Sequence, residues 1–479
     1  IMKERVTTYT RYHIPARPTA NIAPHPSRFQ VRVNRLQLAR LLLTEFLHYR
    51  ANMSVVLSRP CVYGVFSGPI GGFAPNSRRC VGCLRCTVQY PEIVQIYPNP
   101  DRLRLGDSYF TPDLVDTVLY EAATGRVPVR GAGYRGGYGG QGWDGMWTDM
   151  SEIVRPTRDG IHGREFISTS VDLGEKPAFL TIDPSGKPVG EAPRTISLPI
   201  PFLFDLPPAS AESDTLYRAL VAAAEGIQGL AIVPLHRVLE LGLASPAVIP
   251  LVSSSEIDDL ERLPAKPRLI ELDGWEETAY RALRQRHPET PVCVRLPFSG
   301  ETRPEETGFL PRRPGVLSLA QQGLRLFHLT ANYHGQAGNA FVLDAIRSVH
   351  EMLVAEGLRE QTTLIGSGGI IAAEHVPKAI ICGLDAVALD TSPLIALQGR
   401  FHGGCIERAS AAVELPAFEP AWAAQRLMNL AAAWRDQLLE ILGAMGMREV
   451  RRLRGEIGRA MFQVDLEREA FAGIEGYDG

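Results

Sequence analysis

Four of the seven cysteines in this chain of 479 residues fall close together, at Cys61, Cys80, Cys83 and Cys86. The last three form the sequence Cys80-Val-Gly-Cys83-Leu-Arg-Cys86, in which two residues separate each cysteine from the next. Thiolates at this spacing share one loop, and each can bind a different iron of a cubane cluster. The sequence therefore predicts a [4Fe–4S] cluster at this loop.

The fourth ligand of such a cluster has to come from outside the loop. The bacterial ferredoxin spacing continues to a cysteine at position 90, where this chain has Tyr90 followed by Pro91. Cys61 is the nearest remaining cysteine, and the glycines between it and the loop would let the chain fold back. The predicted ligands are Cys61, Cys80, Cys83 and Cys86. Two alternatives stay open, a zinc site, which more often uses two separate C-x2-C pairs, and a group of thiols that binds no metal.

The composition excludes several classes of protein. A net charge of −3 argues against a nucleic-acid-binding protein, which usually carries a strong basic excess. The odd number of cysteines argues against a disulfide framework, and Cys293, Cys382 and Cys405 are interpreted as ordinary buried or loop thiols. The longest apolar run, within 36–47, is interrupted by Arg40, so no transmembrane segment is predicted. The first residues lack the apolar core of a signal peptide, and we expect a cytoplasmic protein.

The elements that would position these residues are read from hydrophobic patterns. Apolar runs predict strands at 196–206, 230–235, 247–253, 268–272, 292–296, 324–330, 363–366 and 386–389. Helical spacing predicts helices at 212–226, 276–287, 340–357 and 372–382, followed by a helical tail at 421–445 and 447–462. Eight strands with helices between most of them indicate an α/β fold, a (β/α)8 TIM barrel, with an open doubly wound sheet as the alternative.

The same patterns divide the chain into five parts. These are a basic extended arm and helix at 1–50, an iron–sulfur module of ferredoxin type at 51–130, a connector at 131–195, the barrel at 196–405 and C-terminal helices at 406–479. The start of the connector, 131–145, is rich in glycine and aromatic residues. It is either a plain linker or an ordered loop that approaches a cofactor or a partner.

Two late segments predict a phosphate site. Gly368 and Gly369 follow a predicted strand and precede a predicted helix, where bare backbone N–H groups can approach an anion. The next predicted strand ends at Asp390, with Thr391 and Ser392 after it. In TIM barrels the loops after the last two strands commonly bind phosphate, although a plain strand–helix turn would also explain the glycines. The candidate residues are Gly368, Gly369, Thr391 and Ser392.

Three further residues are candidates for chemistry at the barrel mouth. Arg295 ends the apolar run 292–296, where a buried charge must be paired and would suit an anion or the electron-rich edge of a flavin. His334 and Gln336 lie in a glycine-bearing loop after another predicted strand, where they could face a substrate. The simpler interpretation of a loop histidine such as His334 is a solvated side chain.

Several of these stretches together resemble a known family. The segments 149–161, 366–370, 379–387 and 391–397, and the tail segment 446–453, are similar to the FMN-binding synthase domain of the glutamate synthase family. Single-chain prokaryotic members carry a ferredoxin-like module before the barrel, as the cysteines indicate here. The resemblance implies FMN at the barrel mouth, electrons arriving through an iron–sulfur centre, and reduction of an imine formed from an oxo acid and ammonia.

The resemblance also implies roles for individual residues. Gly368, Gly369, Thr391 and Ser392 would hold the FMN phosphate. Arg295 would stand where the family usually has a lysine near the flavin, and the loop that contains His334 and Gln336 would face the substrate.

The chain departs from the family pattern in four places. The segment 204–208, Phe-Asp-Leu-Pro-Pro, replaces a Met-Ser-Phe-Gly type turn, and 332–338 replaces a glycine-rich substrate loop. Asp390 stands where a glycine usually precedes the phosphate-binding threonine, and a carboxylate there would repel phosphate unless it is paired. Cys405 is all that remains of a three-cysteine loop, so a [3Fe–4S] centre is not expected.

Two functions remain from the sequence. The first is an oxidoreductase subunit that passes electrons from the [4Fe–4S] cluster to FMN for reductive amination or related amine or oxo-acid chemistry. It would need an electron donor, and an amidotransferase-type subunit if glutamine is the ammonia source. The second is a degenerate, non-catalytic barrel that serves as a scaffold or electron-transfer subunit of a larger complex, with only the cluster functional.

Overall fold

The computed structural model describes residues 12–52, 61–103, 105–128, 142–148, 167–177, 181–189, 193–298, 315–338 and 340–476. Two predicted features lie largely or wholly outside these ranges, the glycine-rich stretch 131–145 before residue 142 and the family-like segment 149–161. The chain forms two compact units. One spans 21–112, and the other combines the residues up to 20 with 113–479. In the described residues no helix is long and apolar enough to cross a membrane.

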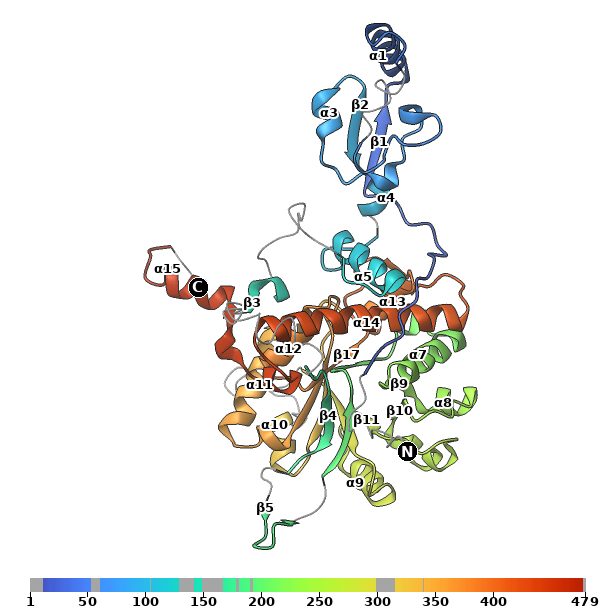
Figure 1. The fold of residues 1–479 in the computed structure, drawn as a ribbon. Coiled ribbons are helices and arrows are strands. Elements are labelled where there is room, and N and C mark those ends of the chain that lie inside the picture. Colours follow the sequence, from blue (N-terminus) through green and yellow to red (C-terminus); the bar gives the residue numbers. More distant parts are fainter. Residues whose placement is uncertain are drawn as a thin grey trace, which may run out of the picture. The chain divides into compact units, whose positions relative to one another are not determined.

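The larger unit contains a closed barrel of eight parallel strands, which confirms the predicted (β/α)8 fold (Figure 1). Around the barrel the strands follow the order β8, β9, β10, β11, β12, β13, β16 and β17, and β17 pairs with β8 to close it. Their bounds are Phe202–Phe204, Ala231–Pro234, Val248–Val252, Ile270–Asp273, Val292–Pro297, Leu326–Thr330, Thr363–Ser367 and Ala386–Leu389. The apolar runs become strands because both faces of a barrel strand are covered.

The first predicted strand, 196–206, is divided in the structure. Its first part is β7 (Arg194–Leu198), which pairs antiparallel with β4 (Val171–Glu175), and only β8 enters the barrel. Pro199 and Pro201 lie between β7 and β8, and a proline cannot donate a ladder hydrogen bond. Thr363, at the start of β16, donates to the carbonyl oxygen of Gly174, so the β4–β7 hairpin covers the amino-terminal end of the barrel strands.

Helices surround the barrel between its strands. They are α7 (Asp214–Gly226), α8 (Leu235–Leu241), α9 (Glu277–Arg286), α10 (Val316–Gln321), α11 (Val342–Ala355), α12 (His375–Cys382) and α13 (Thr391–Ala396). The four helices predicted in this region correspond to α7, α9, α11 and α12. The larger unit also contains short two-stranded antiparallel sheets outside the barrel. They are β5 (Thr181–Ile182) with β6 (Pro188–Val189), β14 (Gln336–Ala337) with β15 (Ala340–Phe341), and β18 (Arg400–His402) with β19 (Ala412–Glu414).

The C-terminal region is helical, as predicted, but not throughout. The helix α14 (Pro420–Ala444) packs against α7 and buries Trp434, whose ring meets Phe202 edge to face. The predicted helix at 447–462 is wrong, because this stretch forms two 3-10 turns and the strand β20 (Ala460–Phe462). That strand pairs with β3 (Met146–Thr148), and a short helix, α15 (Gln463–Phe471), follows it. The helix α5 (Pro112–Thr124) also belongs largely to this unit.

The N-terminal arm lies along α14. From residue 12 to residue 20 it forms no helix or strand. Its backbone is bound by side chains of α14, since Asn429 donates to the carbonyl oxygen of Arg17 at 2.7 Å and Trp422 donates to that of Ala20 at 2.9 Å. The backbone from Arg17 to Ala20 is therefore fixed on the barrel unit.

The smaller unit is built on a two-stranded antiparallel sheet, β1 (Phe29–Val33) with β2 (Val94–Pro98). The α-helices of its described residues are α1 (Arg35–His48), α3 (Arg85–Gln89) and α4 (Pro100–Leu103). The side chain of Asn34 caps α1 by accepting hydrogen bonds from two N–H groups of its first turn. Val31, Val65, Cys80 and Val94 form its core.

Candidate functional site

The cysteine loop of the smaller unit turns sharply between its ligand candidates. Gly82 and Leu84 both have left-handed backbone angles, with φ of 72° and 59°. A side chain at Gly82 would not fit, because its Cβ would lie 2.3 Å from the ring of Phe29. Cys80 is buried and Cys83 is exposed, so the loop presents thiols both to the core and to its surface.

Cys61 belongs to the same group as the loop cysteines. It packs with Cys86 against the apolar cluster that contains Cys80, although it comes from a separate segment. Burial raises the pKa of the Cys80 thiol, and the neighbouring thiols of Cys86, Cys61 and Cys83 raise it further. The thiols of Cys86, Cys61 and Cys83 therefore each lie within electrostatic range of Cys80. Within the described ranges, no three His, Cys, Asp or Glu side chains are arranged so that they could hold a metal ion.

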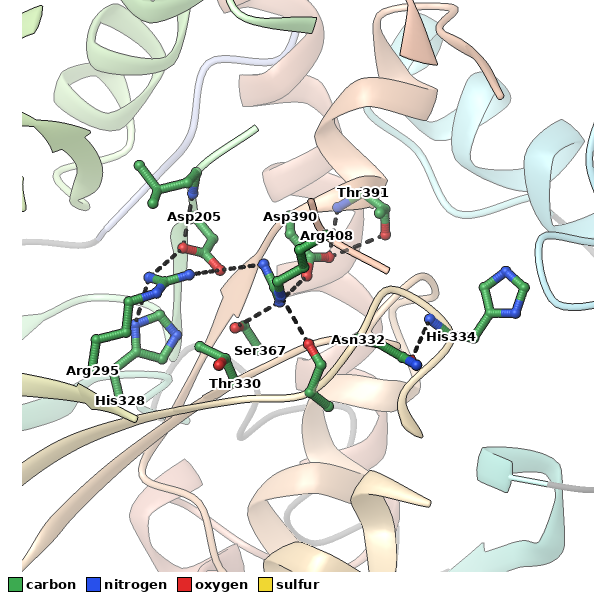
Figure 2. A network of polar contacts seen from close by, with 12 residues as sticks. Asp205, Arg295, His328, Thr330, Asn332, His334, Ser367, Asp390, Thr391 and Arg408 are labelled. Carbon is green, nitrogen blue, oxygen red and sulfur yellow. Dashed lines mark hydrogen bonds and ion pairs between the residues drawn. The ribbon is translucent and has the colours of Figure 1, made fainter. Parts of the chain in front are cut away.

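At the carboxyl end of the barrel strands, Arg295 of β12 spans the barrel interior (Figure 2). Its guanidinium donates to both carboxylate oxygens of Asp205, at 2.8 and 3.1 Å. Asp205 follows β8, which lies opposite β12 in the barrel order. Arg295 also donates to Glu271 of β11 at 2.9 Å, and Glu271 lies 2.9 Å from Nδ1 of His328 on β13. The expected pairing of Arg295 is thus made by two carboxylates of the chain itself.

These charges shift one another's protonation. Burial alone would raise the pKa of Asp205, but the charges of Arg295, His328 and Arg408 outweigh it and hold that pKa far below its usual range. Burial opposes ionisation of Glu271 in the same way, and His328 and Arg295 lower its pKa. Both carboxylates are therefore ionised at neutral pH and fix Arg295 in place.

A second arginine, Arg408, belongs to a loop that follows the barrel strands, and its side chain reaches the barrel mouth (Figure 2). It donates to the carbonyl oxygen of Ala331 at 2.8 Å, to Ser367 Oγ at 3.0 Å and to Asp390 Oδ2 at 2.6 Å. It also lies 3.3 Å from Asp205, so Asp205 links the two arginines. Because Asp390 is paired with Arg408, its carboxylate does not stand alone beside the predicted phosphate site.

The predicted phosphate turn is present at Gly368 and Gly369, with φ of 100° and 71°. An added Cβ on Gly368 would lie 2.6 Å from the carbonyl oxygen of Asn332, so only glycine fits there. Among the described residues, the buried hydroxyl of Ser392 has no hydrogen-bond partner. The turn and this hydroxyl fit a bound phosphate. Thr391 does not, because its N–H and hydroxyl both donate to Asp390.

An aromatic residue from the end of the glycine-rich stretch packs beside this turn. Trp143 is buried and donates through Nε1 to the carbonyl oxygen of Gly369 at 2.9 Å. Its ring stacks on His375, whose Nδ1 accepts from the N–H of Ile371 at 3.2 Å. Burial and the charge of Lys378 lower the pKa of His375 to about 3, so its ring is neutral. The part of the stretch that the structure describes is thus ordered against the phosphate turn.

The two substrate candidates lie outside the ionic network. Figure 2 shows His334 beyond Asn332, directed away from Arg408. The N–H groups of His334 and Gln336 both donate to Asn332 Oδ1, which shapes the loop, and the side chain of Gln336 is exposed. The backbone of this loop nevertheless lies against the phosphate turn, because a Cβ added to Gly335 would be 3.3 Å from Cα of Gly369. Arg295 is linked to the edge of the turn only through Asp205 and Arg408.

Sequence reasoning did not identify Glu271, His328 or Arg408. Glu271 and His328 are polar residues within apolar runs, on the two strands that pair with β12. Polar residues inside neighbouring apolar runs could have indicated that they pair with Arg295. Arg408 carried no such signal, because it reaches the mouth from a loop after the barrel.

Comparison with known proteins relates this site to a family. A family model described as the conserved region in glutamate synthase matches residues 333–448, which include the phosphate turn and Arg408. The archaeal glutamate synthase [NADPH] of Archaeoglobus fulgidus is 24% identical over 88% of this chain and 94% of its own length. The archaeal-type enzyme of Dehalococcoides mccartyi is 24% identical over 79% of this chain and 86% of its own.

Other similarities are shorter or more distant. The archaeal glutamate synthase [NADPH] of Methanocaldococcus jannaschii reaches 38% identity, but over 24% of each chain. Among solved structures, an IMP dehydrogenase/GMP reductase-like protein from Corynebacterium glutamicum covers 63% of this chain and 90% of its own, at 15% identity and a TM-score of 0.36, a similarity too low to bear on function. The chain is therefore similar to archaeal-type glutamate synthases along most of its length, and the conserved region of glutamate synthase matches its residues 333–448.

Proposed function

We propose that this chain is an oxidoreductase of the glutamate synthase type, with a [4Fe–4S] cluster on Cys61, Cys80, Cys83 and Cys86 and a flavin, FMN, at the barrel mouth. One observation carries the cluster assignment: Cys61, from a separate segment, packs together with Cys86 against the apolar cluster that contains Cys80. In a cubane each thiolate binds a different iron, so the four sulfurs surround the cluster and need not meet at one point.

At the barrel mouth, Gly368, Gly369 and Ser392 would bind the phosphate of the flavin, through the backbone of the turn and the hydroxyl of Ser392. A bound flavin supplies hydride transfer to an electrophilic carbon. Arg295 offers a fixed positive charge, oriented by Asp205 and Glu271 rather than by solvent. The loop with His334 and Gln336 would contact the substrate, a small amine or oxo acid.

The chain would act with partner proteins. A cluster held by the four cysteines would supply single-electron transfer, so the chain would need an electron donor, and ammonia from glutamine would need an amidotransferase-type subunit. Both partners are part of the proposed glutamate-synthase-type reaction, in which electrons reduce an imine formed from an oxo acid and ammonia.

A second candidate function is a non-catalytic barrel that supports the cluster within a larger complex. The observation that favours it is the ionic network itself, because Arg295 and Arg408 are both paired with carboxylates of the chain. An arginine that is already neutralised attracts a ligand less strongly.

The cluster is tested on the full chain purified without oxygen. We expect about four irons and four acid-labile sulfides per chain, and absorption near 400 nm that dithionite bleaches. Cys61→Ser should lose iron and change the electron paramagnetic resonance signal of the reduced protein. Cys405→Ser, which removes a buried thiol elsewhere, should change neither. Zinc without iron in the native protein, or a Cys61→Ser variant with unchanged iron content, would contradict the assignment.

The two candidate functions differ in the flavin. Acid extraction of the native protein should release about one FMN per chain, measured by its fluorescence. Gly369→Asp should abolish its retention, because the new carboxylate would add bulk and negative charge at the phosphate turn. If the native protein releases no flavin, the catalytic proposal fails and the non-catalytic barrel is favoured.

A further inference from the structure

We propose that Asp390 is an internal competitor for phosphate at the barrel mouth, and that it lowers the affinity of this barrel for phosphate-bearing ligands relative to their phosphate-free counterparts. The proposal deepens the flavin function proposed above and rests on it for the choice of ligand. Asp390 accepts the hydrogen bonds that a phosphate at this position would receive.

Asp390 accepts three hydrogen bonds from two residues. Its Oδ1 accepts from the N–H of Thr391 at 2.6 Å and from the hydroxyl of Thr391 at 3.1 Å. Its Oδ2 accepts from Arg408 Nη2 at 2.6 Å. A backbone N–H, a hydroxyl and a guanidinium are the donor types that proteins use for phosphate. The side chain of Asp390 is fully buried, so water does not compete for these donors.

Arg408 would keep its position without Asp390. Its Nε donates to the carbonyl oxygen of Ala331, its Nη2 also donates to Ser367 Oγ, and its guanidinium lies 4.9 Å above the ring of Tyr333. These contacts come from the ends of β13 and β16 and from the loop after β13, none of which includes Asp390. Removal of the carboxylate therefore leaves an oriented cation next to the phosphate turn.

The charges of the network oppose an additional anion. Three carboxylates, those of Asp205, Glu271 and Asp390, face two guanidiniums, those of Arg295 and Arg408. His328 is the other titratable group in direct contact with this network. Burial raises the pKa of Asp390, while the charge of Arg408 acts in the opposite direction. A phosphate at the turn would add negative charge beside this carboxylate, and neutralising Asp390 removes that repulsion. The competition is thus electrostatic as well as a matter of shared donors.

Asp390→Asn tests the proposal with the least disturbance. Asparagine keeps the volume of the side chain and an oxygen that can accept from Thr391, but it carries no charge. Asp344→Asn on α11 is the control, because the charged neighbours of Asp344 are Arg347 and Asp465, which do not belong to the network at the mouth. Full-length native and variant chains, with their cluster, are titrated with FMN and with riboflavin, and binding is followed by flavin fluorescence.

We expect the ratio of FMN affinity to riboflavin affinity to rise about tenfold or more in Asp390→Asn relative to the native chain, and to stay unchanged in Asp344→Asn. An unchanged or lower ratio in Asp390→Asn overturns the proposal. Asp390→Gly, which also frees both donors of Thr391, should raise the ratio at least as much.

Inorganic phosphate gives a second measurement that requires no flavin. The melting temperature of Asp390→Asn should rise with phosphate concentration at constant ionic strength, while the native chain and Asp344→Asn show no such rise. If no chain binds either flavin, the flavin part of the proposed function fails, and this measurement still decides the role of Asp390. A rise in Asp390→Asn alone supports the proposal, and equal behaviour of all three chains overturns it.

Discussion

Replacement of Arg295 by methionine tests whether the ionic network stabilises the barrel. The change removes the cation that binds Asp205 at 2.8 and 3.1 Å and Glu271 at 2.9 Å, while keeping a long apolar side chain. Removing one partner of a buried ion pair typically costs about 3–5 kcal/mol. Asp205 would keep Arg408 at 3.3 Å and Glu271 would keep His328, so we expect a loss near the lower value, about 3 kcal/mol at pH 7.

The loss should depend on pH in a defined direction. A carboxyl whose pKa is lowered in the folded chain stabilises it at pH values above the unfolded pKa of about 4, and this contribution is lost as the pH falls through the folded pKa. The cation of Arg295 lowers the pKa of both Asp205 and Glu271. Without it, either carboxyl can take up a proton at a higher pH, which relieves the penalty. The difference between Arg295→Met and the native chain should therefore shrink from pH 8 to pH 5.

Urea denaturation followed by tryptophan fluorescence measures the free energy of unfolding at each pH. Arg284→Met is the matched control, because Arg284 pairs with Glu175 where both side chains are about a fifth exposed, and such pairs contribute about 1 kcal/mol or less. The double variant Arg295→Met/Glu271→Gln should recover part of the loss, since it leaves one buried carboxylate fewer. A loss below about 1 kcal/mol at pH 7, or one that grows toward pH 5, would refute the reasoning.

Three further predictions concern the elements around the site. His375→Leu should cost about 1–3 kcal/mol because it leaves the N–H of Ile371 without its acceptor, whereas His375→Asn should cost less. The native chain should also lose more stability than His375→Asn from pH 6.5 to pH 4.5, since the pKa of His375 is lowered to about 3 and only the unfolded chain takes up its proton there. Gly368→Ala should cost about 1–3 kcal/mol more than Gly357→Ala in urea denaturation, because both glycines have positive φ but only Gly368 has carbonyl oxygens within 3 Å of the added Cβ. Asn429→Ala should speed amide hydrogen exchange in residues 12–20, and unchanged exchange would show that the arm is held by other contacts.

The barrel was predictable because its signal is local. A short apolar run is visible in the sequence without knowledge of its partners, and each of the eight predicted runs overlaps one strand of the barrel. The sequence-based prediction failed where a segment far away in the sequence determines the local structure. The stretch 447–462 has helical spacing, but its end pairs with β3, more than 300 residues earlier in the chain. Gly455, with φ of 73°, also lies within it and disfavours a continuous helix.

The candidate site was predictable only in part for the same reason. The phosphate turn follows from Gly368 and Gly369 at a strand end, which is a local pattern. The pairing of Asp390 was left open by the sequence, because its partner Arg408 comes from a loop whose path depends on the finished barrel. The sequence presents Asp205 only as part of a proline-containing turn, whereas the structure shows that it joins Arg295 to Arg408 across the mouth.

The shared position of Asp205 couples the stability of the barrel to its ligand site. Arg295 is held from inside the barrel and Arg408 from its rim, and both lie against the same carboxylate. A ligand anion that draws Arg408 away from Asp390 also alters the charge that Asp205 shares with Arg295. Substitutions at Asp390 and Arg295 should therefore be non-additive, even though these two residues make no direct contact in the network described. Asp390, which opposes an incoming phosphate, is thus connected through Arg408 and Asp205 to Arg295, which stabilises the barrel interior.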